Sequence, residues 1–376
     1  MQQIVNCRTE VLGGHRQWCA QCGYQRFLYH SCRNRHCPKC QSGAKEAWRK
    51  ARRLELLPVP YFHNVFTLPH EFNELILKSE INQRHLLKLL FDAAASTLLE
   101  FGKSELGGQI GFTIVLHTWD QQLRPHFHLH CLIASGALAR DRSQWIAGGN
   151  RFLFPVRGLS KMFRGKFLAG LRGLLDQRAL TLTELVSTPI KQRQLIRRLF
   201  KKPWVIYSKP PFAGPAKLLN YLSRYTHRVA ITNSRLRKYE NDEVTFTYRD
   251  RRDGDRQKLL TIPANQFIGR FLRHVLPSRF MRIRHYGFMS NRNRKRNIEI
   301  VRRLIGAKAP PHQPPEVSPF DQWLSEVVGV ASSSCPCCGE QLIESELPNR
   351  LSGIRGPFSP DLKSLKLTSQ SKRGPP

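Results

Sequence analysis

The sequence predicts an α+β protein in which a small Cys/His zinc-binding domain precedes one larger domain. Two observations lead to this fold class. Six of the 10 cysteines lie within the first 40 residues, and residues 59–305 mix alternating apolar runs with runs of helical period. Residues 306–376 are rich in Pro, Ser and Lys. We therefore divide the chain into a zinc-binding domain at 1–58, an α+β domain at 59–305, and a linker with a flexible basic tail at 306–376.

The charge balance predicts a polyanionic partner. The chain carries 61 Lys and Arg against 27 Asp and Glu, a net charge of +34 that is spread along its whole length. Basic side chains that neutralise phosphates release condensed counterions, which gives tight and salt-sensitive binding. A basic protein without a nucleic-acid role and a protein of anionic membrane surfaces are the alternatives, but no long basic amphipathic helix favours the membrane. No run approaches about 18 apolar residues and the first residues lack a signal-peptide core, so we expect a cytoplasmic protein with no membrane contact.

Two C-x-x-C pairs in the first domain predict a structural zinc site. Cys19 and Cys22 are separated from Cys37 and Cys40 by 14 residues, a spacing close to that of sites in which four thiolates surround one Zn²⁺. The remaining candidates either bind a second Zn²⁺ or serve packing. The set expected for a second ion is Cys7, His15, Cys32 and His36. A segment this poor in aliphatic residues needs such a metal to fold.

Basic and aromatic residues interleave with these cysteines, and a basic helix over residues 44–57 ends the domain. Arg33 and Arg35 are the expected DNA contacts there. Near the other end of the chain, Cys335, Cys337 and Cys338 offer three thiols without an evident fourth ligand. They form either an incomplete knuckle or a group of reduced cysteines.

The most informative stretch follows a predicted strand at 111–119 and a turn at 120–125. It reads HFHLHCLI, in which His126, His128 and His130 alternate with apolar residues. Side chains alternate between the two faces of a strand, so the apolar residues are expected against the helices and the histidines on the opposite face. His128 and His130 would lie about 7 Å apart at Cα, close enough for both imidazoles to reach one divalent ion. Two histidines leave coordination positions for phosphate and water, as a catalytic site requires; a surface histidine face is the alternative.

A helix predicted at 215–230 places Tyr221 and Tyr225 at i and i+4, on one face and one turn apart. Aromatic residues at this spacing are often core residues. If their face lies over the histidine strand, however, both phenols can attack a metal-bound phosphate. Basic residues of the same helix, Lys217, Arg224 and Arg228, would hold the DNA strand.

Further elements complete the larger domain. Helices are expected at 84–100, 160–176, 263–275 and 291–305, a hairpin at 243–250 and 257–263, and a strand at 281–288. The string Gly102-Lys103-Ser104 lacks the earlier glycine of a phosphate-binding loop, because Thr97 occupies that position. The sequence thus encodes no motor for strand separation.

The order of CRNRHCPKC, HFHLHCLIASG, YLSRYTHRVAITNSRL and RIRHYGF resembles the two-tyrosine HUH transposases of the IS91-type insertion sequences, over about residues 5 to 305. The resemblance implies a ferredoxin-like antiparallel sheet bearing the histidines, with the tyrosine helix beside it. It implies Mg²⁺ or Mn²⁺ at His128 and His130, and Tyr221 and Tyr225 as nucleophiles that move single-stranded DNA by a rolling-circle route. Its third metal ligand is expected at His126 or, second in rank, at His227.

The same resemblance implies single-stranded DNA at transposon ends and target as partner, a host helicase or replication machinery to open the duplex, and a place at the bacterial nucleoid. The alternative function is a non-catalytic, zinc-dependent DNA-binding protein in which the histidines and tyrosines are structural. A third is a metal-dependent hydrolase that uses water.

Overall fold

The structure, a computed structural model, describes residues 2–34, 36–37, 40, 48–149, 153–209, 230–250, 253–308 and 334–349. The chain divides into two compact units: Met1–Cys40 with Gln313–Pro376, and Gln41–His312. The smaller unit thus draws on both ends of the chain. Among the described helices, none is long and apolar enough to cross a membrane.

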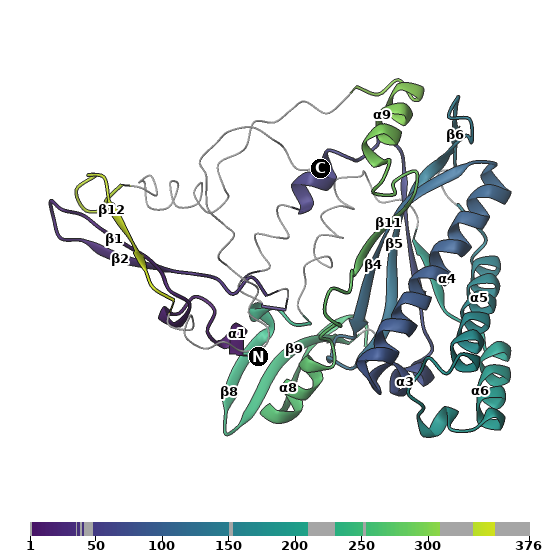
Figure 1. Cartoon of the computed structure of the whole chain (residues 1–376), viewed down its shortest axis with the longest axis horizontal. Helices are drawn as coiled ribbons and strands as arrows, with labels where there is room; N and C mark the ends of the chain where they lie inside the picture. The colour runs from purple at the N-terminus through teal and green to yellow at the C-terminus, as the bar shows by residue number, and fades with distance from the viewer. Residues whose placement is uncertain are drawn as a thin grey trace. The chain divides into compact units, whose positions relative to one another are not determined.

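A central antiparallel sheet organises the larger unit, with strand order β11-β4-β5-β3-β7 (Figure 1). Its strands are β3 (Tyr61–Thr67), β4 (Gln109–Trp119), β5 (Pro125–Leu138), β7 (Ile206–Lys209) and β11 (Ile283–Gly287), and the short β6 (Trp145–Ala147) pairs with β5. Every neighbouring pair is antiparallel. The strands β3 and β4 are therefore parallel to each other on either side of β5, and β5 and β7 on either side of β3.

These connections form two split β-α-β units, as in a ferredoxin-like fold. The short α3 and the long α4 lie between β3 and β4, and α5 and α6 lie between β5 and β7. Among the described residues of this unit, the helices with assigned bounds are α3 (Asn73–Leu77), α4 (Glu80–Leu106), α5 (Val156–Asp176), α6 (Pro189–Lys201), α8 (Ala264–Leu272) and α9 (Arg294–Leu304), and residues 48–53 are also helical. The predicted α+β class, with an antiparallel sheet, flanking helices and a Cys-rich zinc-binding domain before it, is confirmed.

Local sequence explains where the helices begin and end. The Ser79 hydroxyl accepts a hydrogen bond from the backbone N–H of Asn82, and Gly107 ends α4 in a left-handed conformation (φ 68°). Thr188 caps α6 in the same way, with Pro189 at its first position. Gly102-Lys103-Ser104 lies inside α4, so it is not a loop.

The two faces of β5 differ as the alternation predicted. Its apolar residues Phe127, Leu129 and Cys131 are buried in the main core, which α4, α5 and α6 complete on one face of the sheet (Figure 1). On the opposite face, the C-terminal half of β5 packs against α9 and residues 48–57 through Leu132 and Ala134. His128 and His130 lie on this second face, nearer the start of the strand.

A second, three-stranded sheet follows in the same unit, in the order β10-β9-β8. It comprises β8 (Leu236–Glu240), β9 (Glu243–Asp250) and β10 (Arg256–Pro263), and α8 packs on it through Phe246 and Phe267. The hairpin predicted at 243–250 and 257–263 corresponds to β9 and β10.

The smaller unit contains a short helix α1 (Gln2–Val5) and a sheet in the order β12-β1-β2. Its strands are β1 (Gly14–Trp18), β2 (Gln25–Tyr29) and β12 (Ile343–Leu347). Residues 306–376 were predicted to be a linker and flexible tail with a possible incomplete Cys knuckle; within this segment, β12 instead pairs antiparallel with β1 along its whole length. Pairing partners more than 300 residues apart leave no local pattern in a sequence, and β12 has no alternation of apolar residues.

Candidate metal and DNA-cleavage site

Three histidines from two adjacent strands form the candidate catalytic site. His117 on β4 lies directly opposite His128 on β5, and His130 follows two residues later on the same face. One ring nitrogen from each of the three lies within 4.8 Å of the others. All three side chains are buried, with relative exposures of 3%, 8% and 6%. The group can hold a metal ion.

Hydrogen bonds to the outer nitrogens orient two of these rings. Nδ1 of His128 lies 2.8 Å from the carbonyl oxygen of His126, to which it can only donate. Nδ1 of His130 lies 2.8 Å from Nε2 of His63 on the neighbouring strand β3. Burial, together with Lys209, lowers the pKa of His63 to about 4, so its ring is neutral at pH 7. Both contacts engage Nδ1, so Nε2 of His128 and of His130 is the candidate metal-binding atom.

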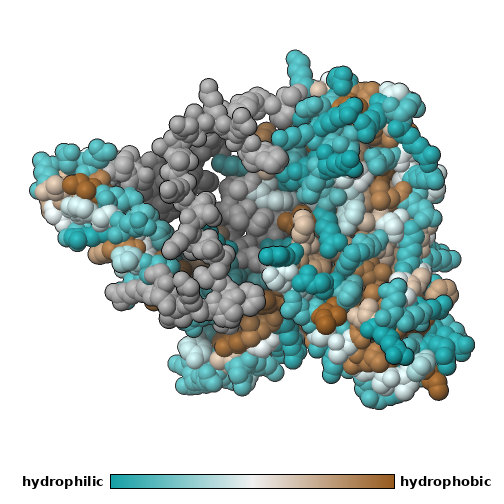
Figure 2. All heavy atoms as spheres, viewed as in Figure 1, coloured by the Kyte–Doolittle hydropathy of each residue, from teal (hydrophilic) through white to brown (hydrophobic). Residues whose placement is uncertain are grey.

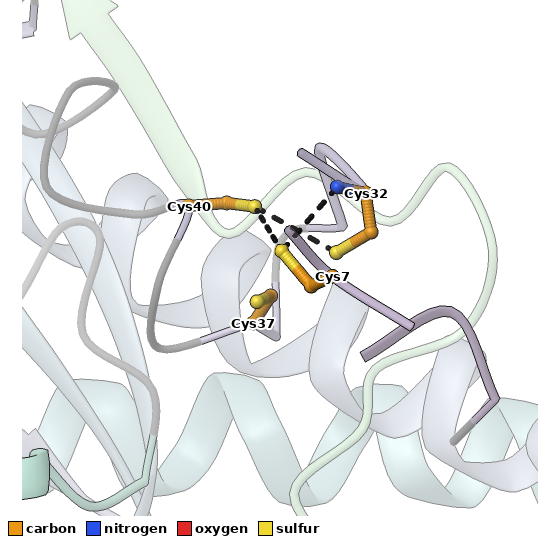
Figure 3. Close-up of side chains that lie close together, drawn as sticks. All are labelled: Cys7, Cys32, Cys37 and Cys40. Carbon is orange, nitrogen blue, oxygen red and sulfur yellow. Dashed lines mark hydrogen bonds between the residues drawn. The ribbon is translucent and has the colours of Figure 1, made fainter. Parts of the chain in front are cut away.

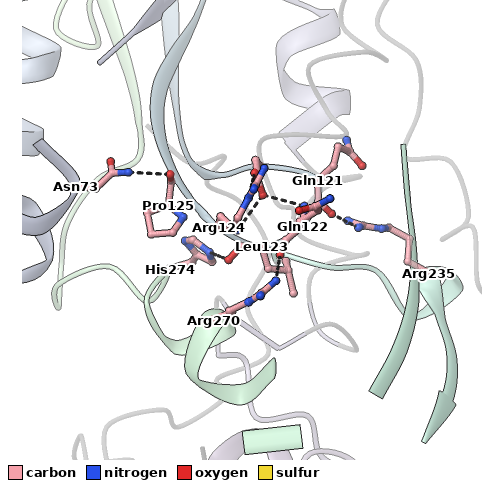
Figure 4. A network of polar contacts seen from close by, with 10 residues as sticks. Asn73, Gln121, Gln122, Leu123, Arg124, Pro125, Arg235, Arg270 and His274 are labelled. Carbon is pink, nitrogen blue, oxygen red and sulfur yellow. Dashed lines mark hydrogen bonds and ion pairs between the residues drawn. The ribbon is translucent and has the colours of Figure 1, made fainter. Parts of the chain in front are cut away.

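The turn between the two histidine strands is held from several sides (Figure 4). Three of its carbonyl oxygens accept hydrogen bonds from later parts of the chain: Gln121 from Arg235, Gln122 from Arg270, and Leu123 from His274. Within the turn, Asp120 accepts bonds from the backbone of residues 122 and 124. A register shift lies between His117 and Trp119, next to the site. These contacts hold the pairing of β4 with β5, and therefore the position of His117 opposite His128.

The third histidine grouped with His128 and His130 is His117, not the expected His126. His126 is exposed, and its ring centroid lies 4.7 Å from that of His128, but it is not one of the three grouped histidines. It contributes its carbonyl oxygen instead. The sequence could have indicated His117, because a hairpin centred on the turn at 120–125 pairs residue 117 with residue 128.

The smaller unit brings eight cysteines into two groups of four. The first group contains Cys7, Cys32, Cys37 and Cys40 (Figure 3). Sγ of Cys40 lies 3.4 Å from Sγ of Cys7 and 3.6 Å from Sγ of Cys32. Four thiolates at such distances can close a tetrahedral shell around one Zn²⁺.

The second group contains Cys19, Cys22, Cys335 and Cys338. The sequence predicted that the two N-terminal C-x-x-C pairs bind one ion together. The structure places them in two different groups, so this prediction is wrong. Each joins different partners, because the loop that carries Cys19 and Cys22 meets the C-terminal loop. The spacing of 14 residues between the pairs gave no indication of this.

The histidines expected at the second zinc ion have other contacts. Nδ1 of His15 lies 3.0 Å from a carboxylate oxygen of Glu344, and its ring meets that of His30 edge to face. The backbone N–H of His36 donates to Asn34. Cys37 and Cys40 take the positions that His15 and His36 were expected to occupy beside Cys7 and Cys32.

Comparison with known proteins identifies the family of this chain. A family model described as "Putative transposase" matches residues 111–297, which include the three histidines, and one described as "Transposase zinc-binding domain" matches residues 1–68. The chain is 43% identical over 365 residues to "Putative transposase y4qJ" of Sinorhizobium fredii, covering 95% of this chain and 90% of the relative. The chain belongs to the IS91-type transposases.

A second relative of this transposase is less similar in sequence. It is 27% identical over 352 residues to "Transposase for insertion sequence element IS801" of Pseudomonas savastanoi pv. phaseolicola, covering 91% of this chain and 81% of that one. Among solved structures, it is similar to a conjugative relaxase TrwC in complex with mutant OriT DNA, at 14% identity and a TM-score of 0.23, covering 64% of this chain and 72% of that one. A TM-score this low supports no conclusion.

As a member of this family the transposase acts on DNA, and it contains a structural zinc-binding domain. Of the expected DNA contacts, Arg33 is exposed and has a positive φ of 49°. Arg35, Lys217, Tyr221, Arg224, Tyr225, His227 and Arg228 lie outside the described residues. A further basic surface lies along α9, where hydrophilic residues predominate in Figure 2. Its exposed basic residues are Lys295, Arg296 and Arg303.

Proposed function

We propose that this transposase nicks single-stranded DNA at the ends of its element through a 5′-phosphotyrosine and rejoins it at a target, by a rolling-circle route. The observation that carries the proposal is the buried group of His117, His128 and His130, set on the sheet of a chain that belongs to a transposase family. A structural zinc site has no need of open coordination positions, whereas three ligands leave positions for phosphate oxygens and water.

The donor set fits a divalent ion, which we propose to be Mn²⁺ or Mg²⁺. Nε2 of His128 and of His130, together with a ring nitrogen of His117, would hold it. The ion would polarise the scissile phosphate and stabilise the charge that develops as the bond breaks. His63 and the carbonyl oxygen of His126 keep the ligand rings in the tautomer that binding requires.

Tyr221 and Tyr225 are the proposed nucleophiles. The phenolate oxygen of one forms a bond to phosphorus as the bond from phosphorus to the 3′ oxygen of the preceding nucleotide breaks, and that oxygen takes up a proton. The products are a 5′-phosphotyrosine and a free 3′-hydroxyl, which keep the bond energy for rejoining. The second phenol would serve the target strand.

Basic residues would hold the DNA: Lys217, Arg224 and Arg228 near the tyrosines, and Arg33 and Arg35 in the zinc-binding domain. The substrate must be single-stranded before cleavage. We propose that a host helicase or the replication machinery supplies it in the cytoplasm, at the nucleoid.

The test is covalent capture. Purified protein with Mn²⁺ and a single-stranded oligonucleotide from its element's terminus is expected to yield a protein–DNA adduct at the 5′ end that survives denaturation. The double variant Tyr221→Phe, Tyr225→Phe is expected to lose the adduct, whereas Tyr239→Phe, an exposed position on β8, is expected to retain it.

Each contrary outcome would point to a different mechanism or function for this chain. An adduct formed by the double variant would exclude both tyrosines as nucleophiles. Cleavage without any adduct would indicate a hydrolase that uses water. Binding without cleavage by the unaltered protein would indicate a non-catalytic, zinc-dependent DNA-binding protein.

A further inference from the structure

We infer that Cys19, Cys22, Cys335 and Cys338 bind a second structural Zn²⁺, so that the C-terminal segment is an integral part of the zinc-binding domain. Both family matches end before this segment, at residues 68 and 297. The inference rests on the smaller unit alone and does not depend on the DNA-cleavage mechanism.

The four sulfur atoms have the geometry of a metal site. Sγ of Cys19 lies 3.4 Å from Sγ of Cys338, and Sγ of Cys22 lies 3.4 Å from Sγ of Cys335. All four lie within 4.8 Å of one another, and none is in a disulfide. A tetrahedral Zn²⁺ with bonds of about 2.3 Å places its sulfur ligands about 3.8 Å apart. The two separations of 3.4 Å are slightly shorter than that value, and every other pair lies within 4.8 Å.

The two loops that supply these cysteines have the same backbone structure. Both read C-x-x-C-G, as CAQCG at 19–23 and CPCCG at 335–339. In each, the glycine N–H donates to the carbonyl oxygen of the first cysteine, at 3.1 Å for Gly23 and 2.9 Å for Gly339. The glycines have φ of 72° and 79°, a region that other residues rarely adopt.

A second hydrogen bond repeats as well. The N–H of the first cysteine donates to the residue after the glycine, at 2.9 Å from Cys19 to Tyr24 and 2.7 Å from Cys335 to Glu340. The loop at 37–40 has neither the glycine nor this bond among its described contacts. The matching pair of knuckles is therefore 19–22 with 335–338, and Cys37 with Cys40 belongs to the other group.

The strands next to the knuckles are consistent with a single site. Trp18, the last residue of β1, pairs with Ile343 of β12, and Gly14 pairs with Leu347. His15 and Gln17 of β1 both contact Glu344 of β12. At Gly13, just before β1, a side chain would collide with the carbonyl oxygen of Leu347, so the backbones approach closely there.

This strand buries little apolar surface. Four of the five residues of β12 are exposed. Its attachment to β1 therefore rests on backbone hydrogen bonds, a few polar contacts and the knuckle. A metal ion that joins the two knuckles supplies the missing stability by closing a loop between residues 22 and 335.

Zinc content tests the ligand pairing. The double variant Cys22→Ser, Cys335→Ser is expected to lose one equivalent of zinc relative to the unaltered protein, because both cysteines belong to one site. The variant Cys22→Ser, Cys40→Ser is expected to lose two. If all four N-terminal knuckle cysteines shared one ion, the second variant would lose one, and the inference would be wrong.

Cys337 provides a matched control. It lies between the two C-terminal ligands, is exposed and belongs to neither group. Cys337→Ser is expected to keep the zinc content of the unaltered protein. Loss of zinc from this variant equal to that from Cys335→Ser would count against a specific site.

Alkylation of the unaltered full-length protein avoids variants that do not fold. In the zinc-loaded protein, Cys337 is expected to react at least ten times faster than Cys335, as measured by mass spectrometry. A chelator is expected to make Cys19, Cys22 and Cys335 reactive together. Equal rates at Cys335 and Cys337 before chelation would overturn the inference.

Discussion

Replacement of His63 tests whether metal binding at the three-histidine group depends on a residue that does not touch the ion. His63 lies 1% exposed on β3, and its Nε2 lies 2.8 Å from Nδ1 of His130. His63→Phe keeps a ring of similar size but removes the acceptor, so Nδ1 of His130 is left without this bond. The three-histidine group itself is unchanged.

The expected cost follows from that one contact. An unsatisfied buried donor costs about 1 to 3 kcal/mol, and loss of such an outer partner weakens metal binding about 10- to 100-fold. Calorimetric titration with Mn²⁺ would measure it. His63→Gln, whose side-chain oxygen can accept the same bond, is expected to recover most of the affinity.

A control separates metal binding from folding. His285 on β11 is a half-buried histidine of this sheet, and it pairs with Thr113 at 2.8 Å and not with the three-histidine group. His285→Phe is expected to lower the melting temperature without changing the Kd for Mn²⁺. The reasoning fails if His63→Phe binds Mn²⁺ within twofold of the unaltered protein, or if His285→Phe weakens binding equally.

Three further predictions concern histidines of the larger unit. His117→Ala is expected to abolish Mn²⁺ binding and oligonucleotide cleavage as fully as His128→Ala. His126→Ala is expected to retain more than a third of the cleavage activity, because its backbone carbonyl oxygen remains. If His126→Ala lost more activity than His117→Ala, His126 would be the third ligand. Three imidazoles are poor ligands for Mg²⁺, so titration is expected to show tighter binding of Mn²⁺, and tighter Mg²⁺ binding would contradict the proposed donor set. Burial lowers the pKa of His274 from 6.5 to about 4. Between these two pH values the unfolded chain binds more protons than the folded protein. The free energy of unfolding therefore falls as the pH drops through this window, by about 3 kcal/mol for this residue. Urea unfolding at pH 7.5 and 4.5 would measure the loss, and His274→Gln is expected to show a smaller one.

Much of the larger unit could be predicted because its patterns are local. The histidine strand alternates along a run of consecutive residues, and the Asp-Gly-bearing turn between 250 and 257 indicated the second hairpin. Helix α4 was predicted at 84–100 and extends over Glu80–Leu106, from the Ser79 cap to Gly107. By contrast, the sequence did not predict β3, although the side chain of its residue His63 contacts His130. A seven-residue strand buried on both faces carries little periodicity.

The candidate sites show the same division. The pair His128 and His130 could be read from one strand, but His117 required the register between two strands. The tyrosine pair, which local spacing suggested, lies outside the described residues and remains a prediction. The zinc pairing was predicted wrongly because equal C-x-x-C spacing does not show which loop meets which.

The sequence by itself determined the partner class, the α+β architecture, the presence of a cysteine-rich metal domain and the face of β5 that carries histidines. Charge, residue type and periodicity are properties of short stretches, so no folded structure is needed to recognise them. Only the tertiary structure decided the third histidine, the contribution of His63 and the joining of the two chain ends in one domain. Each of these depends on residues distant along the chain whose distances in space are set by strand pairing and packing.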